Sequence, residues 1–166
     1  MPNKRIDKLR DKLLERGMAS YRPPPMNAGT DPNPEALAMT QRVRPFAEAM
    51  YLVLAADGDV GERERDVLRG ALRSLTDGKL SSASMESLLC EFERARALQG
   101  VDLRLDSLAA AFYGDRSDAE LALGLMAAAG ETDGTMDASE QAIIFALGER
   151  LGVAKSELQE LLYGTR

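Results

Sequence analysis

Two short acidic segments carry the residues best suited to chemistry in this sequence. Residues 57–64 and residues 133–140 both follow the pattern Asp-Gly-x-h-x-x-x-Glu, in which h is an apolar residue. Each segment joins one apolar helical stretch to the next, so the Glu is expected in the first turn of the second helix. Carboxylate oxygens are the ligands that hard cations such as Ca²⁺ and Mg²⁺ prefer. The pattern therefore predicts two corners, each with a pair of carboxylates that a divalent cation could bridge.

The candidate metal ligands at these corners are eight acidic side chains. The primary candidates occupy the Asp and Glu positions of the pattern: Asp57, Glu64, Asp133 and Glu140. The secondary candidates are their acidic neighbours: Asp59, Glu62, Glu131 and Asp137. One corner alone supplies too few oxygens for tight binding. The metal prediction therefore requires the two corners to converge, so that their oxygens can share one cation.

Comparison with the EF-hand calcium loop shows how incomplete a single corner is. In that loop a glycine is followed two residues later by an apolar residue and six residues later by a bidentate Glu. Gly58, Val60 and Glu64 match these positions, whereas the earlier ligand positions fall on Val53 and Ala55. Each corner is half of a calcium loop at most, and two halves brought together would supply enough oxygens.

The alternative interpretation of the corners is ordinary helix capping. Asp137 and Glu140 fit an Asp-x-x-Glu capping box, and Gly61 with Glu64 makes a weaker version of it. Acidic residues are also favoured in the first turn of a helix, because they offset the positive end of the helix dipole. Asp57 and its counterpart in the second corner could each accept hydrogen bonds from amides of the following helix.

Several kinds of chemistry are excluded by the residue types present. The chain has no His and a single Cys, Cys90. A His/Cys metal site, a Ser-His-Asp or Cys-His catalytic group and an internal disulfide are therefore ruled out. Cys90 follows Leu89 on an apolar helical face, which predicts a core position. No phosphate loop or nucleophile elbow is present, so we expect no organic cofactor and no enzymatic activity.

The charge of the chain is divided unevenly. The formal net charge is −6, and residues 1–22 hold seven basic against three acidic side chains, a net +4 that leaves −10 on the remainder. Such an acidic body repels phosphate, so we expect no nucleic-acid partner. No apolar run is long enough to span a bilayer, and the N-terminus lacks a secretory apolar segment. We therefore expect a cytoplasmic location.

Three regions follow from composition and periodicity. Residues 1–18 are expected to form an N-terminal arm whose helix, residues 4–16, is basic and amphipathic, with one apolar face: Ile6, Leu9, Leu13 and Leu14. Residues 19–34 form a Pro-rich linker, and residues 35–166 a helical domain. The arm could pack on its own domain, dock on a protein partner or lie at the inner face of a membrane. The sequence specifies no oligomeric state.

The fold class predicted for the body is all-α. Helices are expected over seven stretches of the body: 34–56, 62–75, one ending at Gly100, one near 105–112, 117–129, 138–151 and 154–163. With the arm, this predicts a compact bundle of about seven to eight helices built from two related helical hairpins. Pro45 is expected to kink or split the first body helix, and Ser117 with Glu120 to form a capping box. The repeat has an offset of 76 residues, as between Val67 and Ile143.

The two corners and the end of the chain resemble a known family. Residues 54–65 are similar to the first signature of the TerB-like tellurite-resistance family, and residues 132–141 to the second. Residues 151–158 are similar to its closing helix, and the whole resemblance covers about residues 35–163. In the second copy, Gly-Glu-Thr stands where the family usually has an Ala-rich helix end.

The resemblance implies an all-helical fold with acidic residues gathered on one side for a divalent metal. The family's acidic positions correspond here to the primary candidate ligands Asp57, Glu64, Asp133 and Glu140. The resemblance also implies a role in a bacterial stress or tellurite-resistance system, and related modules occur in a membrane-anchored J-domain co-chaperone. The expected function is thus a metal-linked binding module with a protein partner. The alternatives are a metal-free interaction module that docks a partner through a groove or its N-terminal helix and, ranked last, a carboxylate-based hydrolase.

Overall fold

The computed structural model describes residues 34–131 and 134–164. The expected arm, residues 1–18, and the linker before Pro34 lie outside the described residues. None of the described helices is both long enough and apolar enough to span a membrane.

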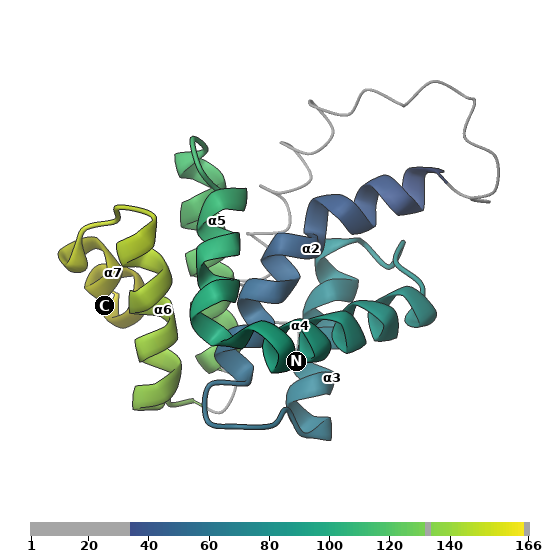
Figure 1. Cartoon of the computed structure of the whole chain (residues 1–166), viewed down its shortest axis with the longest axis horizontal. Helices are drawn as coiled ribbons and strands as arrows, with labels where there is room; N and C mark the ends of the chain where they lie inside the picture. Colours follow the sequence, from purple (N-terminus) through teal and green to yellow (C-terminus); the bar gives the residue numbers. More distant parts are fainter. Residues whose placement is uncertain (1–33, 132–133, 165–166) are drawn as a thin grey trace.

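Six helices and no strands make up the described part of the chain, so the all-α prediction is confirmed (Figure 1). Their bounds are α2 (Pro34–Leu54), α3 (Glu62–Leu75), α4 (Ser82–Ala111), α5 (Arg116–Gly130), α6 (Ala138–Arg150) and α7 (Lys155–Tyr163). The expected seven to eight helices exceed this number for two reasons. The helix expected at residues 4–16 lies outside the described residues. The two helices expected on either side of Gly100 form one element, α4, which is kinked there because Gly100 adopts a non-helical conformation with φ 81° and ψ 166°.

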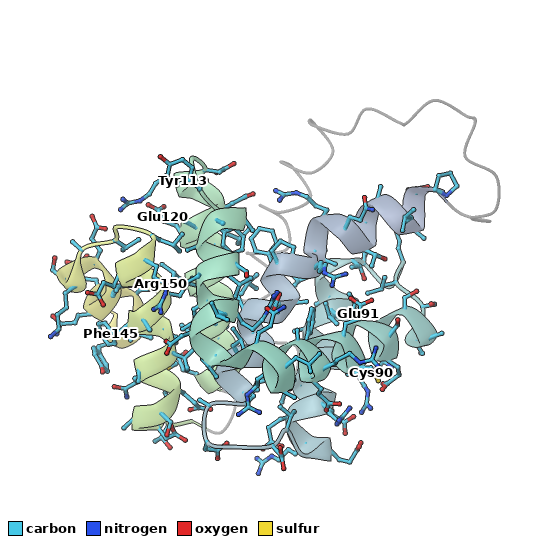
Figure 2. All side chains as sticks on the ribbon, viewed as in Figure 1. Cys90, Glu91, Tyr113, Glu120, Phe145 and Arg150 are labelled. Atoms are coloured by element: carbon cyan, nitrogen blue, oxygen red, sulfur yellow. The ribbon has the colours of Figure 1, made fainter. Side chains whose placement is uncertain are left out.

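Three local predictions need correction or refinement. Pro45 does not split its helix, since α2 continues through it and bends partway along its length (Figure 1). The N-cap of α5 is Asp115 rather than Ser117, and its side chain accepts a hydrogen bond from the Asp118 amide at 2.9 Å. Cys90 is exposed on the outside of α4 and is not a core residue (Figure 2). It stands one position away from the buried stripe of that helix: Met85, Leu88, Leu89 and Phe92.

The core is centred on α2 and α5. Every residue from Phe46 to Leu54 is buried, as is every residue from Leu121 to Gly130. Apolar positions all around a helix, rather than on one stripe, are typical of a helix enclosed by others. Two aromatic contacts attach α4 and its C-cap residue Phe112 to this centre, Phe46 with Phe112 at 5.1 Å and Tyr51 with Phe92 at 5.8 Å between ring centroids.

The two central helices run in the same direction. Near their beginnings, Arg42 of α2 donates two hydrogen bonds to the Asp118 carboxylate of α5, at 2.9 and 3.2 Å. Near their ends, a Cβ added to Gly130 would lie 3.3 Å from Cγ1 of Val53. Arg42 and Asp118 are 76 positions apart, which is the repeat offset. The α2–α3 and α5–α6 hairpins therefore pack side by side in parallel, and each central helix contacts both α3 and α6.

Candidate metal centre

The two acidic corners lie at the same end of the bundle. We call residues 55–64 the first corner and residues 131–140 the second corner. Because α2 and α5 are parallel, both helices deliver the chain to the same end, at the bottom of the view in Figure 1. A Cβ added to Gly130, which would lie 3.3 Å from Cγ1 of Val53, would also lie 3.0 Å from Cε of Met136. Met136 of the second corner thus packs at the end of the helix from which the first corner starts.

The first corner is held by α4 as well as by its own turn. The Gly58 amide donates to the Ala55 carbonyl at 3.2 Å, and Gly58 has a φ of 146°, which an L-residue adopts only with strain. Arg96 of α4 donates to the same carbonyl at 2.9 Å. Val60 is only 9% exposed, so the apolar position of the motif tucks beneath the turn. The turn hydrogen bond, the hydrogen bond from Arg96 and the burial of Val60 therefore fix the shape of the corner.

Three carboxylates of the first corner take no part in the contacts that fix it. Asp57 and Asp59 are exposed and Glu64 is half-buried. Among the described residues, none of these three carboxylates makes a hydrogen bond or an ion pair. Glu64 folds back over Gly61, with Oε2 2.8 Å from the place where a Cβ on Gly61 would stand. Gly61 is the N-cap of α3 and no side chain caps it, so the capping interpretation fails at this corner.

Glu62 has a structural role instead. Its carboxylate lies 3.4 Å from Nη1 of Arg69 and 4.0 Å from Nε of Arg65. Arg69 also binds Asp66 at 2.8 Å and Glu86 of α4 at 2.7 Å. The hydrogen bond to Glu86, followed by that to Asp66, raises the pKa of Arg69, and the same guanidinium lowers the pKa of Glu86. This network joins α3 to α4 and engages the Glu62 side chain.

The second corner is capped in the way that its sequence pattern indicates. Asp137 Oδ1 accepts from the Glu140 amide, and Glu140 Oε2 accepts from the Asp137 amide, both at 2.9 Å. These reciprocal bonds form a capping box at the start of α6. Glu131 is half-buried at the end of α5, and its carbonyl accepts from the Gly134 amide at 2.9 Å. Asp133, the remaining primary candidate, lies outside the described residues.

No preassembled metal centre is present in the described ranges, where no three acidic or Cys side chains are grouped closely enough to hold an ion. The structure brings the two corners to one end without assembling such a group from their described carboxylates. Like charges without a counterion repel one another, so electrostatics disfavours gathering several carboxylates at one point. A bound cation would reverse that preference by drawing oxygens from both corners together.

A hollow beside the first corner was not anticipated from the sequence. It has a volume of about 690 Å³ and lies between the first corner and α4 at its kink. Tyr51, Arg65, Glu93 and Arg96 line its polar part, and Arg65 pairs with Glu93. Burial raises the pKa of Tyr51, and the neighbouring Arg96 opposes that shift. These residues come from three helices and share no local motif, so only the tertiary packing brings them together.

Comparison with known proteins gives one match. Residues 46–162 match the family model described as Tellurite resistance protein TerB. Among curated proteins and solved structures, no match was found. The matched range begins within α2, ends within α7 and contains both corners.

Proposed function

The chain belongs to the TerB family of tellurite resistance proteins, and we propose that it is a binding module whose two acidic corners take up one divalent cation. The observation that carries this proposal is the parallel packing of α2 and α5, which places both corners at one end of the bundle. Met136 of the second corner packs there beside Val53, at the end of α2. Convergence is the condition on which a shared cation depends.

The unengaged carboxylates of the first corner support the proposal further. Asp57, Asp59 and Glu64 have no partner within the described ranges, and they can turn toward a cation without breaking a described interaction. The second corner would contribute chiefly through Asp133. Its capping box already uses one oxygen each of Asp137 and Glu140, so these two side chains are expected to contribute less.

Ca²⁺ fits this donor set better than Mg²⁺ does. Ca²⁺ accepts six to eight oxygens in irregular geometry, whereas Mg²⁺ requires a nearly ideal octahedron and keeps much of its water. Two corners of different shape, one capped and one not, suit the more tolerant cation. Water would complete the coordination shell, because each corner supplies only part of it.

A calcium titration of the full chain tests the proposal. We expect Ca²⁺ to raise the melting temperature of the metal-stripped protein and to release heat in calorimetry. A ligand at 100 times its Kd stabilises the folded state by about 2.7 kcal/mol. The Asp57→Asn/Glu64→Gln variant should lose this response.

The matched control for that experiment is Asp77→Asn. Asp77 and Gly78 form a third Asp-Gly turn, exposed between α3 and α4, but Ser84 stands where the corner motif has Glu. The control should respond to Ca²⁺ as the wild type does. Equal responses from the wild type and Asp57→Asn/Glu64→Gln, or no response at millimolar Ca²⁺, would contradict the proposal.

The cellular role that we propose is stress or tellurite resistance in the cytoplasm of a bacterium, exerted through a protein partner. It rests on the family to which the chain belongs. Deleting the gene and measuring tellurite tolerance tests it, with complementation by the wild type and by Asp57→Asn/Glu64→Gln. Restoration by the wild type alone would connect the corners to the resistance.

The second candidate is a metal-free interaction module, and the exposed leucines of α4 favour it. Leu98 is 78% exposed and Leu103 is 56% exposed, and such apolar side chains are common in protein contacts. This candidate predicts that partner capture is unchanged by a chelator and by Asp57→Asn/Glu64→Gln. A carboxylate-based hydrolase ranks last among the candidate functions.

A further inference from the structure

Two opposite charges in the hollow beside the first corner have no charged partner. The charged side chains that line this hollow are Asp59, Arg65, Glu93 and Arg96. Arg65 and Glu93 pair with each other. Within the described part of the chain, neither Asp59 nor Arg96 forms an ion pair. The hollow therefore offers one carboxylate and one guanidinium whose charges no described side chain neutralises.

One backbone turn brings these two residues together. The Ala55 carbonyl oxygen accepts hydrogen bonds from Nη2 of Arg96 at 2.9 Å and from the Gly58 amide at 3.2 Å. Asp59 follows Gly58 directly in the chain. The turn thus holds the guanidinium and Asp59 as neighbours that are not joined as a pair. A guanidinium has five N–H donors, so the bond to Ala55 leaves several of them for a ligand.

The uncharged lining of the hollow is mostly apolar. Val60 is buried, and Ala97 and Val101 add further apolar side-chain surface. Tyr51 is only 2% exposed, and its hydroxyl lies beside Arg96. The volume of about 690 Å³ is within the range of small-molecule sites. Such sites combine apolar walls with a few placed polar groups, and the hollow has that composition.

We propose that the hollow binds a free α-amino acid with an apolar side chain. Its carboxylate accepts hydrogen bonds from Arg96, its ammonium donates to Asp59, and its side chain lies on Val60 and Val101. A ligand with a single charge would face a like charge in the hollow, so charge complementarity favours a ligand that carries both. In an α-amino acid the two charged groups are bonded to one carbon atom, which suits two opposite charges held at one turn. A residue within a peptide has neither charge and lacks this match.

Titration of the full chain with L-leucine, followed in amide proton–nitrogen correlation spectra, tests this proposal. The buffer contains a chelator, so the result does not depend on the Ca²⁺ binding proposed above. We expect saturable shifts of the amides that border the hollow, residues 59–60 and 96–101, at about millimolar ligand or below. Isocaproate lacks the ammonium and isoamylamine lacks the carboxylate. Each should bind about tenfold more weakly than L-leucine or worse, because each loses one charge-assisted contact.

The Asp59→Asn variant tests the ammonium contact. Asp59 is exposed, so the fold should persist. L-leucine should bind about tenfold more weakly to this variant, whereas isocaproate should bind at least as tightly as to the wild type. Asp57→Asn is the matched control, because Asp57 is an exposed carboxylate of the same corner that does not line the hollow. It should bind L-leucine as the wild type does.

The Arg96→Gln variant tests the carboxylate contact in the same way. It should weaken the binding of L-leucine and of isocaproate alike, and leave isoamylamine bound at least as tightly as by the wild type. The proposal is overturned if L-leucine gives no saturable shift of the amides that border the hollow. It is also overturned if isocaproate or isoamylamine binds as tightly as L-leucine, or if Asp59→Asn binds L-leucine as tightly as the wild type does.

Discussion

Replacing Gly130 by valine tests whether the second corner packs against the ends of the two central helices. A Cβ at this position would stand 3.0 Å from Cε of Met136 and 3.3 Å from Cγ1 of Val53, both closer than ordinary van der Waals contact. Valine adds two further methyl groups at a site that is already buried. Overpacking of this kind costs about 1–3 kcal/mol. Relief from the low helix propensity of glycine returns only a few tenths of a kcal/mol.

We therefore expect Gly130→Val to lower the free energy of unfolding by about 1–2 kcal/mol. In a chain of 166 residues, each kcal/mol corresponds to about 2–4 °C in melting temperature. Urea unfolding followed by circular dichroism measures the change. Gly70→Val is the control, because Gly70 is exposed on α3 and a Cβ there would meet nothing within 4 Å. It should be neutral or slightly stabilising.

A double-mutant cycle shows whether crowding against Met136 causes the loss of stability in Gly130→Val. Shortening the crowding side chain in Gly130→Val/Met136→Ala should recover part of the lost stability, since residues in contact do not contribute additively. Equal stabilities for Gly130→Val and Gly70→Val would refute the contact. So would strict additivity of the Gly130 and Met136 changes, because the second corner would then not rest on the central helices.

Three further predictions concern ion pairs and caps. Glu48 is 4% exposed and binds Arg104 at 2.6 and 2.9 Å, so Glu48→Ala should cost about 3–5 kcal/mol by chemical unfolding, and Glu48→Met/Arg104→Met should cost clearly less. Asp137→Ala removes one half of the capping box and should cost about 1 kcal/mol in the same assay, whereas Asp137→Asn should retain most of the stability. Arg69 lowers the pKa of Glu86 in the folded state, so the stabilisation it gives is present above the unfolded pKa and is lost as pH falls through the folded value. A carbon-detected NMR titration should place the Glu86 midpoint below its ordinary value and return it toward that value in Arg69→Gln; an unchanged midpoint would refute the pairing.

The sequence predicts the helices well because their signals are local. Apolar spacing and Asp-Gly turns mark most helix ends, Gly100 marks the kink of α4, and the Asp-x-x-Glu pattern identifies the capping box at Asp137. The error at Cys90 came from a shift of one position around a helix, which moves a side chain by about 100°. Asp115 was missed because Ser117 offered a competing capping pattern two residues later.

The candidate site is made of residues that lie far apart in the chain, so the sequence predicts it less well than it predicts the helices. The repeat offset indicates two related hairpins, but only the packing shows that they are parallel and that both corners share one end. The contact of Arg96 with the Ala55 carbonyl joins residues 41 positions apart, and nothing in either neighbourhood signals it. Similar motifs also behave differently, since Glu140 is used in a cap while Glu64 folds over Gly61 and has no described partner.

The stoichiometry of Ca²⁺ binding, measured by calorimetry on the full chain, tests the central claim most directly. A cation shared between corners predicts one Ca²⁺ per chain, with binding lost both in Asp57→Asn/Glu64→Gln and in Asp133→Asn. Two independent sites, or binding that persists when either corner is disabled, would contradict it.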